Sequence, residues 1–511
     1  MVFTERGRTL LMVVPLMTAI LLSSAASVSR AAAPHASGQT LNIAMISDVN
    51  FLDPNLAGSY YDRQILNNVT DKLFDLDARG RIVPMLATHS TVSKDHMTYT
   101  LTLRHGVKFQ DGTPFNAAAV KFNLDRYRQP TSARYPEVKD ITSVTAAGAY
   151  TVKIKLDAPF SPLLSIFTDR SGMMMSPKAV QSEGLNFTLH PVGTGPFIFQ
   201  DRVKGDHITL VRNPHYWRKG YPKASKVVFK IFTDPNVQLV NVQSGQVDLI
   251  DDVTSQNVAA VRNDKNLKYI NKAGYAFAGF WLNTQSPPFN NKSVREAVSL
   301  LIDRKEFVRV TAGKTATAAN SPFGPGELAY GSWDKPPARD VKKAKQLLAR
   351  AHVSDLSFTF KTTTAPISTQ QAQIIASYLQ AGGFTMNIQA EDFPTILSDG
   401  AKHNFQAAAI GWSGRPDPDQ NIASWISPGA TYNYGQYSNA TVNKYMLLAR
   451  RQVVAKKRQA DYGKIAAQLN QDQPYIYLDH ANYSMASTKK LQGFVSVPDG
   501  IIRCVGLYLS K

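Results

Sequence analysis

Four side chains suited to ligand binding lie close together in one stretch of the chain. Trp412 offers an indole ring, Arg415 a guanidinium, and Asp417 and Asp419 two carboxylates, with glycine and proline between them. The stretch follows the apolar run 405–410, which has the length of a buried strand. Because ligands of open α/β sheets bind beyond the carboxyl ends of strands, this pattern suits a loop that binds a polar solute. A structural turn is the alternative that these residues leave open.

Catalytic motifs are missing from this loop and from the rest of the sequence. In Gly411-Trp-Ser-Gly-Arg415, the arginine stands where the nucleophile elbow G-x-S-x-G needs its last glycine. Ser487 and Lys490 have S-x-x-K spacing, but the motifs that accompany this spacing in enzymes are absent. The ten histidines are dispersed, and neither H-E-x-x-H nor C-x-x-C occurs. We therefore predict a protein that is not an enzyme, with no catalytic residues, no metal site and no cofactor.

The first 33 residues have the three parts of a secretory signal peptide. Arg6 and Arg8 supply the positive charge, residues 10–22 the apolar run, and the three alanines at 31–33 the cleavage site. The apolar run is too short for a membrane anchor, and there is no cysteine near the cleavage site to carry a lipid. We expect residues 1–33 to be removed on export, leaving a periplasmic protein that is not lipid-anchored.

Length, cysteine content and net charge further restrict the class of protein and the partners that we expect. Removing 33 of 511 residues leaves 478, enough for two or three domains. The only cysteine, Cys504, lies in an apolar run, so we predict a core residue rather than a nucleophile. The formal net charge is +19, and the lysines and arginines are scattered rather than clustered. This pattern favours attraction to an anionic ligand or membrane, and we expect no nucleic-acid partner.

Alternating strand and helix patterns predict an α/β fold. Two β-α-β units are indicated, at 226–250 and 356–389. The segment 76–190 is instead rich in strands, and apolar residues alternate with threonine at 99–103. Asn116 is well placed to cap a helix within this segment. The segment therefore reads as a β-rich subdomain inserted into a larger α/β protein.

A turn near the start of the chain is a candidate for the second wall of the ligand crevice. Leu52 and Asp53 follow a predicted strand at 41–46 and precede a helix that begins near Tyr61. A simple strand-to-helix connection is the alternative.

Seven segments, in the same order along the chain, match the signature of one protein family. They are Tyr99–Phe115, Val192–Phe197, Val211–Trp217, Gln243–Leu249, Trp281–Thr284, Phe289–Arg304 and Pro498–Ile501. The chain resembles the extracellular solute-binding proteins of bacterial ABC importers, family 5, which includes the periplasmic dipeptide-, oligopeptide- and nickel-binding proteins. The resemblance covers essentially everything after the signal peptide.

This resemblance implies the α/β fold of a two-lobed periplasmic binding protein, type II and of the large peptide-binding class, with an extra β-rich subdomain. The implied parts are lobe I at 34–75, 191–282 and 482–511, its accessory subdomain at 76–190, and lobe II at 283–481. Crossings near Asn283 and Ala481 would form the hinge on which the lobes close around a solute. The closed form, a monomer, would then deliver the solute to the permease subunits of the importer.

One position departs from the peptide-binding members of the family. Their residue three places after the loop tryptophan is an aspartate that pairs with the α-ammonium of the peptide, and here it is Arg415. Its planar fork suits a carboxylate or phosphate and would repel an ammonium. In one interpretation, Asp417 or Asp419 takes the ammonium and Arg415 pairs with the other. In the other, which we favour, Arg415 clamps an anionic solute, such as an acidic peptide or an opine-like carboxylate. A third alternative has Arg415 pointing to solvent.

The remaining predicted contacts are aromatic and polar. Trp412 is placed to stack on the solute, and Tyr432 and Tyr434 to offer hydroxyls at the rim. The full predicted ligand-binding set is Leu52, Asp53, Trp412, Ser413, Arg415, Asp417, Asp419, Tyr432 and Tyr434.

The predicted function is a periplasmic receptor of an ABC importer that captures peptides or similar small polar solutes, including anionic ones. One alternative is a nickel-, sugar- or opine-type receptor of the same family. The other is a periplasmic sensor or chaperone-like binding protein that takes no part in transport.

Overall fold

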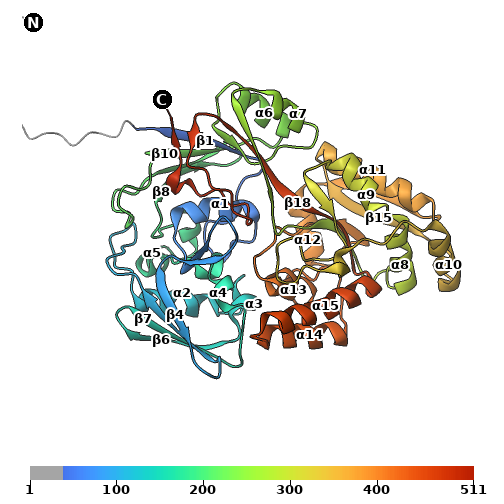
Figure 1. Cartoon of the computed structure of the whole chain (residues 1–511), viewed down its shortest axis with the longest axis horizontal. Helices are drawn as coiled ribbons and strands as arrows, with labels where there is room; N and C mark the ends of the chain where they lie inside the picture. Colours follow the sequence, from blue (N-terminus) through green and yellow to red (C-terminus); the bar gives the residue numbers. More distant parts are fainter. Residues whose placement is uncertain (1–37, 511) are drawn as a thin grey trace, which may run out of the picture. The chain divides into compact units, whose positions relative to one another are not determined.

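The structure, a computed structural model, describes residues 38–510. Residues 39–510 belong to one compact unit, and the predicted signal peptide at 1–33 lies outside the described residues. Figure 1 shows sheets flanked by helices throughout this unit. The predicted α/β class is confirmed. The names lobe I, accessory subdomain and lobe II are kept below for the predicted segments, except that residues 274–282 are described with lobe II, because residues 280–282 pair with residues 407–409.

Lobe I is built on a mixed sheet with its first strand in the middle. In order across the sheet, its strands are β11 (Leu249–Ile250), β1 (Thr40–Met45), β10 (Lys226–Ile231), β9 (His207–Arg212) and β8 (Phe197–Val203). β1 is parallel to both of its neighbours, so three carboxyl ends meet at one edge. Leu41 and Ile43 lie on one face of β1 and Ala44 on the other, and all three are fully buried, as expected for a strand covered on both faces.

The helix α1 (Tyr60–Val69) packs its apolar face on this sheet. Ser59 caps it, and the Asp62 side chain bonds back to the Ser59 backbone, which completes a capping box. The remaining helices and strands of lobe I are α6 (Pro235–Gln243), α7 (Val258–Asn263), β2 (Phe74–Leu76), β12 (Leu267–Ala273), β19 (Leu491–Gln492) and β20 (Tyr508–Leu509). Cys504 is fully buried in the lobe I core, which confirms the prediction of a core residue.

The accessory subdomain has its own sheet and core. Its strands are β3 (Ile82–Pro84), β4 (Ala87–Val92), β5 (Thr98–Leu103), β6 (Ile141–Gly148) and β7 (Thr151–Leu156), of which the last four form one sheet in the order β4-β5-β7-β6. Its helices are α2 (Ala117–Tyr127), α3 (Tyr135–Val138), α4 (Leu163–Ile166) and α5 (Pro177–Glu183). Asn116 caps α2, as predicted. Threonines that alternate with Leu101 and Leu103 on β5 leave one face of this sheet apolar, and α2 packs into the same core.

Lobe II places helices around a second group of strands. Its strands are β13 (Ala278–Leu282), β14 (Ala316–Ala318), β15 (Ser357–Thr363), β16 (Thr385–Glu391) and β17 (Ala407–Ala409). Its helices are α8 (Lys292–Leu301), α9 (Arg304–Thr311), α10 (Val341–Ala351), α11 (Pro366–Gln380), α12 (Phe393–Ala401), α13 (Pro418–Ile426), α14 (Ala440–Arg451) and α15 (Ala455–Asp472). Trp281, Trp425 and Tyr475 pack together at the centre, with ring centroids 4.9 to 5.5 Å apart. The sequence pattern did not predict α13.

One long strand, β18 (Tyr475–Thr488), joins the two lobes (Figure 1). Residues 475–479 pair with β13, whereas residues 482–488 pair with β12. The chain therefore changes from one group of strands to the other between Ala273 and Ala278. The sequence pattern predicted only the first four residues of β18, because its second half alternates small and polar residues.

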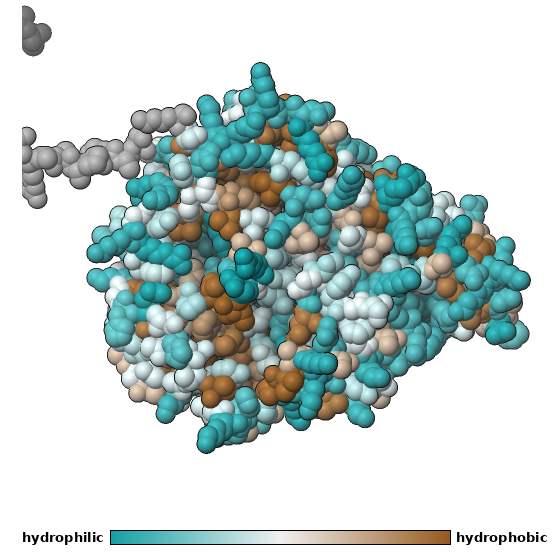
Figure 2. All heavy atoms as spheres, in the orientation of Figure 1, coloured by the Kyte–Doolittle hydropathy of each residue, from teal (hydrophilic) through white to brown (hydrophobic). Residues whose placement is uncertain are grey.

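The surface in the view of Figure 2 is largely hydrophilic. Hydrophobic side chains gather on this face mainly in a band left of the centre. Among residues 38–510, no helix has both the length and the apolar character needed to cross a membrane.

A buried carboxyl on β18 leads to a pH-dependent prediction. Asp479 is 6% exposed, and burial raises its pKa to about 6, with His480 opposing the shift. A raised native pKa contributes stability below the unfolded pKa of about 4, and this contribution is lost as the pH rises through 6. Asp479→Asn should therefore raise the free energy of unfolding at pH 7.5 by about 2 kcal/mol and have little effect at pH 4.

Chemical unfolding of both proteins at the two pH values tests this prediction. The same substitution at Asp206, whose side chain is 73% exposed, is the control and should change neither value by more than about 0.5 kcal/mol. An Asp479→Asn variant that is less stable than the parent at pH 7.5 would show that the charged form is favoured in the native protein.

Candidate functional site

The loop 411–415 is fixed at both ends by backbone contacts within lobe II. The Trp412 amide donates to the Phe277 carbonyl at 2.9 Å, and the Phe277 amide donates back at 3.1 Å. Gly414 has φ +69°, and a Cβ there would lie 2.1 Å from the Tyr275 carbonyl carbon. Only glycine fits so close an approach with this backbone conformation. The loop is therefore held against the segment that leads into β13.

Arg415 points from this loop into the protein interior, toward the accessory subdomain. Its side chain is 3% exposed, and its Nε lies 2.7 Å from Oδ2 of Asp169. Its Nη1 donates to the Ser413 hydroxyl at 3.1 Å and to the Gly414 carbonyl at 2.6 Å. The guanidinium also lies 5.0 Å from the Trp412 ring centroid, a cation–π distance. The alternative in which Arg415 points to solvent is wrong, because the side chain is buried.

Asp169 is shared by three arginines. Arg63 Nε donates to Oδ1 at 3.1 Å, Arg170 Nε lies 3.6 Å from the same atom, and Arg415 approaches Oδ2. Burial alone would raise the pKa of Asp169, but the charges of Arg63, Arg415 and Arg170 outweigh burial and hold it well below its usual range. Asp169 is therefore a permanent carboxylate that links lobe I to the loop of lobe II.

A fourth arginine lies beside this group. Arg134 Nη1 is 2.5 Å from Oε1 of Glu137, and Arg134 and Arg170 donate to one carbonyl, that of Ala57, at 3.1 and 3.0 Å. We call the following set the arginine cluster: Arg63, Arg134, Arg170 and Arg415, with Asp169 and Glu137. Only Arg415 was predicted from the sequence. The others lie outside any motif, and no local signal marks them.

Asp417 and Asp419 are occupied by other partners. Arg458 donates two hydrogen bonds, of 2.7 and 2.6 Å, to the Asp417 carboxylate, and Asp417 also caps α13. Arg450 Nε lies 3.0 Å from Asp419, whose pKa burial raises to about 6 against the opposing charge of Arg450. The interpretation in which Arg415 pairs with one of these carboxylates, which we did not favour, is thus wrong. Both aspartates anchor the loop to α14 and α15, and neither is left free for an ammonium group.

The two predicted tyrosines have different environments. Tyr434 is 5% exposed and packs edge-on against Trp425, so it belongs to the lobe II core. Tyr432 is half-buried, and its ring lies 5.4 Å from that of Trp412. A Cβ at Gly58 of lobe I would lie 3.8 Å from the Tyr432 hydroxyl. Tyr432 is therefore the tyrosine that reaches across to lobe I.

The two residues predicted for the lobe I wall, Leu52 and Asp53, are held by contacts within lobe I and its accessory subdomain. Leu52 is buried in the lobe I core, and Asp53 forms an ion pair with Arg126. The Asp53 carbonyl accepts hydrogen bonds from the amides of Leu56 and Ala57, which closes the turn. The residues of this turn that approach the arginine cluster and Tyr432 are therefore Ala57 and Gly58, rather than Leu52 and Asp53.

Two lobe I tyrosines that the sequence did not single out complete the contact. Tyr60 and Tyr483 are stacked with ring centroids 6.0 Å apart and planes 10° apart. The Tyr483 hydroxyl donates to the Ser413 carbonyl at 3.0 Å, and the Tyr60 hydroxyl donates to the Gly500 carbonyl at 2.6 Å. Ser413 therefore makes two of the contacts at this site: its carbonyl accepts from Tyr483, and its hydroxyl accepts from Arg415.

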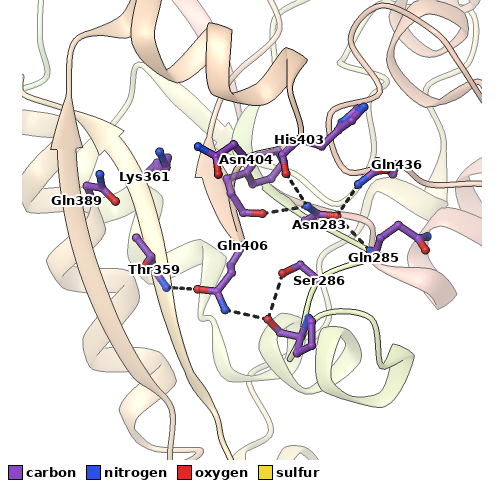
Figure 3. A pocket seen from close by; sticks show the side chains of 12 residues that line it. Asn283, Gln285, Ser286, Thr359, Lys361, Gln389, His403, Asn404, Gln406 and Gln436 are labelled. Carbon is purple, nitrogen blue, oxygen red and sulfur yellow. Dashed lines mark hydrogen bonds between the residues drawn. The ribbon is translucent and has the colours of Figure 1, made fainter.

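A separate pocket of about 580 Å³ lies on lobe II (Figure 3). Its lining is rich in side-chain amides, and Asn283 and Gln406 lie near its centre. Asn283 Nδ2 donates to the Phe405 carbonyl at 3.0 Å, and Gln406 Nε2 donates to the Pro287 carbonyl at 2.9 Å. These amides hold the backbone together, and the pocket shares no residue with the arginine cluster. Within the described residues, no three His, Cys, Asp or Glu side chains are grouped to hold a metal.

Comparisons with known proteins agree with this architecture. The model of the family described as "Bacterial extracellular solute-binding proteins, family 5 Middle" matches residues 81–433. The glutathione-binding protein GsiB of Salmonella choleraesuis (strain SC-B67) is 30% identical over 485 residues, which cover 92% of this chain and 94% of that protein.

Solved structures of periplasmic binding proteins have the same fold as this chain. The periplasmic binding protein DppA of Helicobacter pylori, in complex with the peptide STSA, is 25% identical, with a TM-score of 0.86 over 93% of this chain and 98% of that one. AgaA of A. tumefaciens R10, in complex with agropinic acid, is 22% identical, with a TM-score of 0.85 over 93% and 99%. The two-lobed fold predicted from the sequence is confirmed.

Proposed function

The chain belongs to the bacterial extracellular solute-binding proteins, family 5, and we propose that it captures a small acidic peptide or a similar carboxylate between its lobes. Members of this family bind solutes rather than transform them. The solute would be passed to the permease subunits of an ABC importer, and it would be released unchanged. The proposed receptor acts as a monomer in the periplasm after cleavage of the predicted signal peptide.

One observation carries this proposal: a loop of lobe II meets lobe I through buried polar groups. Arg415 reaches Asp169, and the Ser413 carbonyl accepts the Tyr483 hydroxyl. Polar groups are rarely buried between two lobes unless they are paired or serve a ligand. Trp412 and Tyr432 add aromatic surface at the same place, suited to a peptide or another planar group.

The class of solute is inferred from the relatives together with the charge of the site. GsiB is named for binding glutathione, and DppA was solved with a tetrapeptide. Position 415, where the resemblance to the peptide-binding members implies an aspartate that binds an ammonium group, is here a buried arginine. A glutathione-like peptide, whose two carboxylates outnumber its single ammonium group, is therefore the favoured solute. An opine-like carboxylate is the second candidate, supported by the same arginine.

A thermal-shift panel on the protein purified from a periplasmic fraction tests the proposal. The panel contains glutathione, a neutral tripeptide, an opine-like dicarboxylate, a sugar and Ni²⁺. A ligand at 100 times its Kd adds about 2.7 kcal/mol of stability, enough to shift Tm by a few degrees. We expect glutathione or the dicarboxylate to shift Tm and to be recovered unchanged. A shift with the sugar or Ni²⁺ alone would contradict the proposed solute class.

A deletion strain separates transport from sensing. Loss of uptake of the solute identified by the panel is expected when the gene is removed, and normal uptake would instead favour the sensor or chaperone-like alternative.

Mass spectrometry of the purified protein also locates its first residue, which we expect to be Pro34.

A further inference from the structure

We propose that the arginine cluster is an anion subsite that binds two carboxylates of the solute, and that these carboxylates allow the lobes to close. This inference rests on the proposed function, because it takes the solute to lie between the lobes. It adds three lobe I arginines to the site and assigns them a partner of defined charge.

The first observation is an excess of positive charge in a buried place. Arg63, Arg134, Arg170 and Arg415 are between 1% and 3% exposed. Their acidic partners in the cluster are Asp169, at 6% exposed, and Glu137, at 14%. Four guanidiniums against two carboxylates leave two positive charges uncompensated, a costly arrangement in a site shielded from water.

Neighbouring ion pairs do not supply the missing charge, because each is balanced on its own. Asp53 is paired with Arg126. Two further carboxylates, those of Asp75 and Asp499, share the cations Arg503 and Lys72. The carboxylates of Asp53, Asp75 and Asp499 are therefore already paired with their own cations, and the two excess charges of the cluster are suited to an external anion.

The second observation is a set of guanidinium N–H groups without acceptors. Among the described residues, Arg63 Nη1, Arg134 Nε and Arg170 Nε are buried and have no hydrogen-bond partner. Arg170 Nε lies 3.6 Å from the nearest oxygen of Asp169, which is too far for a hydrogen bond. Buried donors in native proteins are nearly always paired, so three unpaired guanidinium N–H groups within one cluster are suited to receive further oxygens.

The electrostatics of Arg415 agree with these contacts. Burial, together with the charges of Arg63 and Arg170, lowers its pKa to about 9, while the charges of Asp169 and Glu137 oppose the shift. Arg415 is still charged at neutral pH, but bringing it up to three lobe I arginines is unfavourable unless anions enter with it. Because Arg415 is the lobe II member of the cluster, an anion that bridges it to lobe I favours the closed arrangement.

The test uses glutathione derivatives in which the two carboxylates are esterified one at a time, with inorganic phosphate as a separate anion. Calorimetric titration compares glutathione, its glycyl monoester, its diester and inorganic phosphate. We expect the affinity to fall about 10-fold for the monoester and at least 100-fold for the diester, because each loses a charge-assisted contact. Phosphate binding in competition with glutathione would place a dianion in the cluster and overturn the assignment to two separate carboxylates.

Variants then assign the effect to the cluster. Arg415→Met and Arg170→Met should each weaken glutathione binding at least 50-fold, and Arg415→Lys, which keeps the charge but not the fork, should give a smaller loss. Without solute, Arg415→Met should leave Tm unchanged or raise it, since a repulsive charge is removed. Arg309→Gln, at a side chain 72% exposed, is the control and should bind normally.

The possible failures are distinguishable. If no member of the solute panel binds, the proposed function fails. If the diester or a neutral tripeptide binds as tightly as glutathione, and Arg415→Met binds like the parent, the receptor function stands and the anion subsite is overturned.

Discussion

Asp169→Asn is expected to lower the free energy of unfolding by about 3–5 kcal/mol, the range seen when one partner of a buried ion pair is removed. Asp169 neutralises Arg63, Arg170 and Arg415, and its loss would leave Glu137 as the single carboxylate for four buried guanidiniums. The native pKa is depressed, so this stabilisation is present above the unfolded pKa of about 4 and is lost as the pH falls below it.

Urea unfolding at pH 7, with and without solute, measures this effect. Asp206→Asn, at an exposed position, serves as the control for the loss of one carboxylate. Added glutathione should restore part of the lost stability, because its carboxylates would take over the countercharge. A variant as stable as the parent would mean that Asp169 does not neutralise the cluster. The ion pairs of Asp169 with Arg63, Arg170 and Arg415 would then contribute little to the free energy of unfolding.

Gly414→Ala is expected to have the second-largest effect, on solute binding. A left-handed backbone conformation alone disfavours alanine by about 1–3 kcal/mol, and the added Cβ would lie 2.1 Å from the Tyr275 carbonyl carbon. The loop must move away from the β13 side of lobe II, and Arg415 moves with it. We expect the affinity for glutathione to fall at least 10-fold while the circular dichroism spectrum stays native.

Gly429 provides a matched control for this substitution. It has the same φ of +69°, but nothing lies within 4 Å of the position that a Cβ would occupy. Gly429→Ala should therefore show the backbone strain without the collision, and it should bind glutathione like the parent. Equal affinities for the parent and the Gly414 variant would show that the position of the loop 411–415 is not critical for binding.

Local sequence patterns predicted most of the helices and strands, because the residues that form each pattern are also the residues that form its contacts. The alternation of Leu101 and Leu103 with threonine gave β5, and Asn116 marked the start of α2. The helix α13 was missed, because its first turn contains Pro418 and Asp419 and its helical spacing is short. Proline at the first position of a helix is compatible with helix formation, but it reads as a turn when no longer pattern follows.

The site itself was only partly predictable, for a different reason. The buried state of Arg415 follows from a contact with Asp169, which lies 246 positions earlier in the chain and outside the signature segments. Charge and composition in the loop suggested Asp417 or Asp419 as its partner, but Arg458 and Arg450 reach these carboxylates from α15 and α14. Such choices depend on how the lobes pack, and no local rule encodes them.

Closure around an anionic solute is the central expectation, and small-angle X-ray scattering of the purified protein titrated with glutathione measures it most directly. The radius of gyration should fall in step with the occupancy measured by calorimetry, and the diester at the same concentration should leave it unchanged. Arg415→Met should keep the open value at every concentration tested. If glutathione binds and the radius of gyration does not change, or if the diester produces the same decrease, closure does not depend on the anion and the arginine cluster has another role.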